Sequence, residues 1–322
     1  MRLSLILSLV AAPALADIPS TISDHILPGH ERLASSTAAL ADSARTDCSP
    51  EAVTPAFHEA YDAWIAISHI QFGPIEDQQL SLAMAFWPDP KDRTGRALSR
   101  LVEAQDPIID DAIAFNEVSA AAQGFTALER LLYEPQTDTA YACRLTAAIA
   151  QGLADKSRII AEGWPAYADL MLTAGEDGNT RFQTPLEVKR AAFTALSTGL
   201  EFLHDARLGR PLGTFDRPRP RRAEARRSER SVRHITLALS ALEDLATHLS
   251  TGPTPETTDA FTRAKAQAAA LDDPALAGVA EPGKRIRIEA LQVSVGEIQA
   301  AVINEIGVPL EVTAGFNALD GD

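Results

Sequence analysis

The stretch VRHITLALSALEDLATHL, residues 232–249, carries its apolar side chains at a helical spacing. These side chains step along the chain by three or four positions: Val232, Ile235, Leu239, Leu242, Leu245 and Leu249. Residues 291–302 repeat the pattern with Leu291, Val295, Ile298 and Val302. Such spacing places the apolar residues on one face of an α-helix. The chain is rich in alanine and leucine and shows little of the alternation typical of strands. It is therefore predicted to be an all-α protein of packed helical bundles.

Polar breaks divide the helical pattern into two parts. The segment TAGEDGNTRFQTP, residues 173–185, contains two glycines and a proline and is the predicted linker. We expect one helical bundle in residues 17–178 and a second in residues 179–322. GFTALERLL (124–132) and GLEFLHDARL (199–208) both place glycine and glutamate near the start of an amphipathic run. This echo suggests that one four-helix-bundle-like unit was duplicated.

The chain begins MRLSLILSLVAAPALAD, which has the features of a secretory signal peptide. A basic residue precedes an apolar stretch, and Ala14-Leu15-Ala16 forms a small-x-small cleavage signal. Residues 1–16 are therefore predicted to be removed, leaving a periplasmic protein. No later apolar run approaches the roughly 20 residues that a spanning helix needs. With 44 acidic and 29 basic side chains, the net charge of −15 argues against nucleic acid or an anionic membrane surface as the partner.

The chain has two cysteines, Cys48 and Cys143. In an oxidising compartment an even pair predicts one disulfide. Two separate thiols are the alternative.

The segment GFTALE, residues 124–129, has an incomplete metal-binding pattern. Thr126 and Glu129 lie one helical turn apart, where histidine and glutamate would be standard ligands for zinc or iron. Gly124 would let another part of the chain approach closely. With this motif the chain resembles the imelysin-like family, also described as the M75 peptidases, whose hallmark is Gly-x-His-x-x-Glu. Three further segments resemble the family in order and spacing: WIAISHIQFGPIEDQQLSLAMAFWPD (64–89), RLGRPLG (207–213) and GFNALDGD (315–322).

The resemblance implies a two-domain helical fold, export from the cytoplasm and a link to iron uptake. Thr126 departs from the family pattern, because threonine is a poor ligand for these metals and cannot act as a general base near neutral pH. The chain also contains no His-Glu-x-x-His. We therefore favour a non-catalytic exported binding protein, serving acquisition of iron or another cation, with Gly124, Thr126 and Glu129 in a groove between the bundles. A metallopeptidase of the M75 type and a module that binds a protein or peptide are the alternatives. Iron and zinc are the candidate metals.

Other polar residues have spacings that suit ligands. His58, Asp62 and His69 share one helical face, and Glu201 lies one turn before Asp205. In each case the alternative is ordinary hydrogen bonding or helix-end ion pairing. The candidate groove residues outside the motif are His58, His69, Glu76, Asp77, Glu201, Asp205 and Arg207.

Residues 217–233 carry eight arginines against two glutamates. A cluster of this kind can bind phosphate or carboxylate groups. Because the rest of the chain is acidic, we favour pairing with carboxylates of the first bundle, or a solvated helix face, as the role of these arginines.

Overall fold

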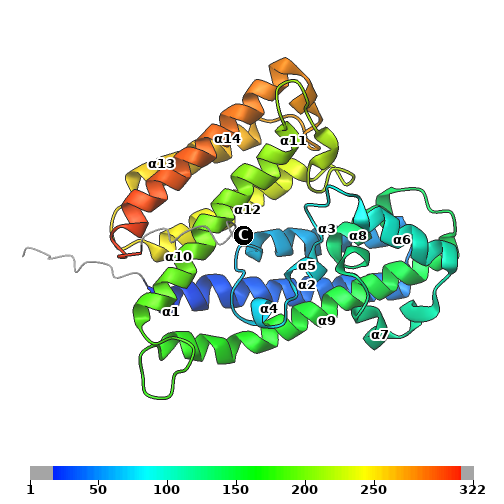
Figure 1. Cartoon of the computed structure of the whole chain (residues 1–322), viewed down its shortest axis with the longest axis horizontal. Coiled ribbons are helices and arrows are strands. Elements are labelled where there is room, and N and C mark those ends of the chain that lie inside the picture. Colours follow the sequence, from blue (N-terminus) through cyan, green and yellow to red (C-terminus); the bar gives the residue numbers. More distant parts are fainter. Residues whose placement is uncertain (1–16, 313–322) are drawn as a thin grey trace, which may run out of the picture.

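The computed structural model describes residues 17–312, and this part of the chain is helical almost throughout (Figure 1). The only β-type pairing within it is two isolated bridges. The predicted all-α class is confirmed. The predicted signal peptide and the GFNALDGD segment lie outside the described residues.

The first group of helices contains the long α9, which packs along α2 in Figure 1. α2 also packs on α3, and α8 packs between α3 and α9. The bounds of this group are α1 (Ile18–Ser20), π-helical η1 (Thr21–Ile26), α2 (Leu27–Thr46), α3 (Pro50–Ile67), α8 (Gly124–Tyr133) and α9 (Thr139–Leu172). Short elements join α3 to α8: α4 (Pro74–Asp77), α5 (Ser81–Met84), α6 (Arg93–Ala104), 3₁₀ turn η2 (Pro107–Asp110), α7 (Ala112–Asn116) and 3₁₀ turn η3 (Ala120–Ala122).

The second group includes α12, which is the helix predicted from the apolar spacing of residues 232–249. Its side chains at 235, 239, 242, 245 and 249 are all buried. α13 and α14 lie side by side, as Figure 1 shows. The bounds of this group are α10 (Pro185–Glu201), π-helical η4 (Phe202–Gly209), α11 (Arg210–Leu212), 3₁₀ turn η5 (Pro220–Arg222), α12 (Ser231–Leu249), α13 (Pro255–Ala269), 3₁₀ turn η6 (Ala277–Ala280), α14 (Pro282–Val302) and π-helical η7 (Ile303–Gly307).

The two groups meet where α12 packs on α3 and on η1. α9 ends at Leu172 and α10 begins at Pro185, so the predicted linker is the loop between the groups. One connected apolar core nevertheless runs through both groups, from Ile18 to Val312. The division into two domains at residue 178 therefore stays a prediction, as does the duplication.

A disulfide joins Cys48, in the turn between α2 and α3, to Cys143 in α9. The two Cα atoms are 5.2 Å apart, within the range that a disulfide spans. The predicted pairing is confirmed, and it closes the end of the first group at which these helices meet.

Candidate functional site

Gly124 lies at the start of α8, against the backbone at the end of α5. Its φ of +75° belongs to the left-handed region, which favours glycine. A Cβ atom at this position would lie 2.5 Å from the Ala83 carbonyl oxygen and would overlap Met84 as well. The expected close approach is thus present, and an isolated bridge from Gly124 to Ala85 holds it.

Glu129 connects the two groups of helices. Only 2% of its surface is exposed. Its Oε1 atom accepts hydrogen bonds from the backbone N–H groups of Arg227 (3.1 Å) and Ser228 (2.9 Å) and from the Ser228 hydroxyl (2.8 Å). Residues 227 and 228 belong to the turn that leads into α12. Glu129 is therefore buried and hydrogen-bonded at the junction of the two groups. This carboxylate anchors a loop of the second group to α8.

Thr126 lies one turn before Glu129 and is also buried. Its hydroxyl oxygen makes no hydrogen bond within the described residues, and it faces the same pocket as Glu129. Tyr61 of α3 lines this pocket too. Burial raises the pKa of Tyr61 well above its usual range, and the carboxylates of Glu224 and Glu129 act in the same direction. The phenol is therefore neutral. Thr126 places a hydroxyl group where the family motif has a histidine, and the Tyr61 phenol lines the same pocket.

A buried ion-pair network lies behind the pocket. The Glu224 carboxylate accepts a hydrogen bond from Arg207 Nε at 2.7 Å, and His234 Nδ1 lies 3.2 Å from the same oxygen. Burial alone would raise the pKa of Glu224, but the charge of Arg207 and the bond to His234 lower it to about 2. Glu224 is therefore ionised and paired. Its role is to join η4 to α12, so Arg207 has a structural partner.

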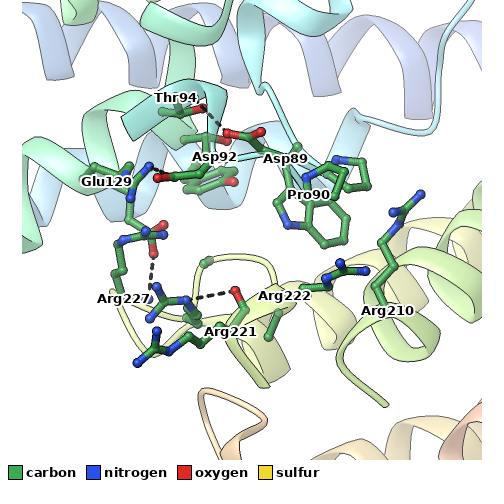
Figure 2. Close-up of a pocket in the computed structure, with 17 residues that line it drawn as sticks. Asp89, Pro90, Asp92, Thr94, Glu129, Arg210, Arg221, Arg222 and Arg227 are labelled. Atoms are coloured by element: carbon green, nitrogen blue, oxygen red, sulfur yellow. Dashed lines mark hydrogen bonds and ion pairs between the residues drawn. The ribbon is translucent and has the colours of Figure 1, made fainter. Parts of the chain in front are cut away.

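A pocket of about 390 Å³ opens beside Glu129, between the first group and the loop that precedes α12. Figure 2 shows carboxylates on one wall and arginines on the opposite wall. The charged side chains that line the pocket are Asp89, Asp92, Glu129, Arg130, Arg210, Arg221, Arg222, Arg226 and Arg227.

The two predicted histidine ligands lie elsewhere and have other partners. His58 Nε2 is 2.7 Å from the Tyr133 hydroxyl. Burial, followed by the charge of Arg230, lowers the pKa of His58. His69 Nε2 is 2.8 Å from His25 Nε2, and burial, together with His25, holds the pKa of His69 well below its usual range. Neither imidazole reaches the pocket beside Glu129, since neither lines it.

The predicted acidic ligands are also dispersed. Glu76 and Asp77 are exposed in α4, where Glu76 pairs with Arg181 at 3.3 Å. Glu201 is half-buried, and Asp205 is exposed and bonded to His204 at 2.6 Å. None of these carboxylates lines the pocket beside Glu129, so the structure does not assemble the groove that we expected from these residues.

Iron or zinc does not fit the residues at the motif. Thr126 supplies no imidazole, and one oxygen of Glu129 already accepts three hydrogen bonds. Within residues 17–312, no group of three or more His, Cys, Asp or Glu side chains is arranged to hold a metal ion.

Some arginines of the segment 217–233 pair with carboxylates of the first group, and others line the pocket beside Glu129. Three of its arginines pair with carboxylates of the first group, as we expected: Arg227 pairs with Glu134, and Arg230 and Arg233 pair with Asp62. Three others, at 221, 222 and 226, line the pocket. Our candidate list from the sequence omitted these three. The signal that could have identified them was the run of arginines in an acidic chain.

No helix in residues 17–312 is both long enough and apolar enough to cross a membrane.

Comparison with known proteins agrees with this fold. An imelysin-like protein from Psychrobacter arcticum 273-4 superposes with a TM-score of 0.78 at 19% identity, over 93% of this chain and 96% of that one. A protein described as an iron-regulated protein A precursor, from Parabacteroides distasonis ATCC 8503, superposes with a TM-score of 0.75 at 11% identity. The match covers 92% of this chain and 97% of that one. No curated protein matches the sequence. The profile of the imelysin family, Peptidase M75, matches residues 26–302. The chain therefore belongs to the imelysin family.

Proposed function

We propose that the chain is an exported, non-catalytic binding protein that serves iron acquisition and takes its ligand into the pocket beside Glu129. The observation that carries this proposal is the state of the family motif. Glu129 is engaged in joining the two groups of helices, while a polar pocket remains open next to it. A binding role needs such a pocket and tolerates a structural Glu129.

A metallopeptidase would need a metal with an open coordination position, and usually a base. Thr126 provides neither a strong ligand nor a base, and the candidate histidines bond to Tyr133 and to His25. These contacts favour binding over proteolysis.

The link to iron comes from similarity. One structural neighbour is described as iron-regulated, and the family resemblance implies iron uptake. Export is supported by the disulfide, which suits an oxidising compartment, and by the signal-like residues 1–16.

Two measurements test the proposal. A strain lacking the gene should accumulate less radioactive iron under iron limitation, and the wild-type gene should restore uptake. Equal accumulation with and without the gene would contradict the role in iron acquisition.

The second measurement concerns catalysis. The purified protein should show no proteolysis that a chelator abolishes. Calorimetric titration of wild type and Thr126→His with Zn²⁺ should give no tight stoichiometric binding in either, because the other ligands do not converge. Chelator-sensitive proteolysis that is lost in Glu129→Gln would establish the peptidase instead.

A further inference from the structure

The pocket beside Glu129 has an excess of positive charge in an acidic protein. Six arginines and three carboxylates line it, an excess of three positive charges, whereas the whole chain carries −15. Arginines placed at random on this chain would have many carboxylates to pair with, so their gathering here needs a local explanation.

All three carboxylates of the pocket already have partners. Asp89 accepts hydrogen bonds from the backbone N–H groups of Arg93 (2.9 Å) and Thr94 (2.8 Å), at the start of α6. Asp92 pairs with Arg130. Glu129 accepts three bonds from the turn before α12. A cationic ligand would therefore have to compete with protein donors for each of these groups.

Four arginines of the pocket have no carboxylate partner among residues 17–312: Arg210, Arg221, Arg222 and Arg226. Arg222 and Arg226 are only partly exposed. Burial, followed by repulsion from Arg227, lowers the pKa of Arg226, and these effects outweigh the opposite effect of the Glu129 and Glu134 carboxylates. The backbone holds the wall in place, because η5 begins at Pro220, closely after Pro218, and Arg226 Nε donates to the Arg221 carbonyl at 3.1 Å.

The pocket also presents neutral polar groups. The Thr126 hydroxyl is buried without a hydrogen-bond partner, and it faces the same space as the arginines. A hydroxyl that can donate, beside several guanidinium groups, suits an acceptor-rich ligand. Guanidinium groups bind carboxylate and phosphate oxygens through paired N–H donors.

We propose that this pocket binds a small oxyanion with two or more negative charges, a phosphate or a polycarboxylate, through Arg210, Arg221, Arg222 and Arg226. The cavity of about 390 Å³ admits a small organic anion. A long polyanion such as nucleic acid is disfavoured by the net charge of the chain. This inference rests on the pocket being the ligand site of the proposed function, but it does not depend on iron.

Calorimetric titration at low ionic strength tests the inference, with inorganic phosphate and citrate as separate probes. We expect saturable binding of at least one probe with a Kd below about 1 mM. The variant Arg221→Gln/Arg222→Gln should weaken binding about tenfold or more, since bonds between charged groups are lost. Arg210→Gln is a second variant, because its side chain is exposed and its loss should leave the fold intact. It should also weaken binding.

The matched control is Arg217→Gln/Arg219→Gln. It removes the same charge from the same loop, and neither side chain lines the pocket. Its affinity should stay within about twofold of wild type, well below the tenfold that one lost charged bond produces. Absence of saturable binding by either probe up to about 10 mM, or equal weakening in the control, would overturn the oxyanion site.

Iron separates this inference from the proposed function. Citrate that binds equally with and without Fe³⁺, to a protein whose gene does not affect iron uptake, would support the oxyanion site and refute the role in iron acquisition. Normal iron uptake by the Arg221→Gln/Arg222→Gln variant, with neither probe bound by wild type, would refute the oxyanion site and leave the role in iron acquisition standing.

Discussion

The backbone approach at Gly124 yields a prediction with a magnitude that follows from geometry. In Gly124→Ala, alanine has to adopt a φ of +75°, which costs about 1–2 kcal/mol relative to glycine. The new Cβ would also lie 2.5 Å from the Ala83 carbonyl oxygen, so the backbone of one segment has to move. Overpacking of this kind costs about 1–3 kcal/mol. We therefore expect the free energy of unfolding to fall by about 2–5 kcal/mol.

Urea denaturation followed by circular dichroism measures this change as a shift of the midpoint at an unchanged slope. Gly252→Ala is the matched control, because nothing lies within 4 Å of its added Cβ and its φ is not positive. The control should stay within about 0.5 kcal/mol of wild type.

The same substitution should affect the pocket. The segment displaced by alanine continues into Trp87, Pro88 and Asp89, which line the pocket. Binding of the oxyanion probe should therefore weaken even at urea-free conditions in which the variant is folded. A Gly124→Ala protein as stable as the control, with unchanged probe affinity, would refute the assignment of Gly124 to backbone approach.

Three further predictions concern stability. Glu129→Ala should lower the free energy of unfolding by about 3 kcal/mol, and Glu129→Gln by about 1 kcal/mol. The glutamine amide oxygen can still accept from the three donors, whereas alanine has no acceptor. Equal losses for the two variants in urea denaturation would contradict this. Burial, followed by the charge of His25, lowers the pKa of His30 to about 3. Below pH 6.5 the His30 imidazole is therefore protonated in the unfolded chain but still neutral in the folded chain. The contribution of neutral His30 to the free energy of unfolding is therefore complete above pH 6.5 and is lost as the pH falls toward 3. His30→Phe should remove about 2 kcal/mol of the decrease that urea titrations of wild type show between pH 6.5 and 5. The same pH profile in wild type and variant would contradict this prediction. The unreduced, denatured protein should show no alkylatable thiol by intact mass. Reduction of Cys48–Cys143, whose cysteines lie 95 residues apart, should cost up to about 4.7 kcal/mol.

Patterns that depend on neighbours along the chain were predictable. The spacing of Leu239, Leu242 and Leu245 predicted α12, since helical periodicity is a local property. The polar run at 173–185 predicted a loop for the same reason, and the structure has one there. Glycine at 124 and glutamate at 129 were identified because a family motif preserves their spacing.

The partners of the candidate ligands were not predictable. His58 and His69 were predicted to share a helical face, yet α3 ends at Ile67, before His69. His58 bonds to Tyr133, and His69 bonds to His25. Those partners lie 75 and 44 residues away in the chain. Spacing within one helix says which side chains face the same way, and it carries no information about what faces them.

Taken alone, the sequence determined the helical class, the two cysteines available for pairing, the family motif and the gathering of arginines in one segment. Only the tertiary structure decided that Glu129 anchors the turn at Ser228, and that some arginines pair while Arg222 and Arg226 line a pocket. The physical reason is range. Apolar periodicity and backbone preferences act over a few residues, whereas a buried carboxylate or guanidinium is defined by groups that packing brings from distant parts of the chain.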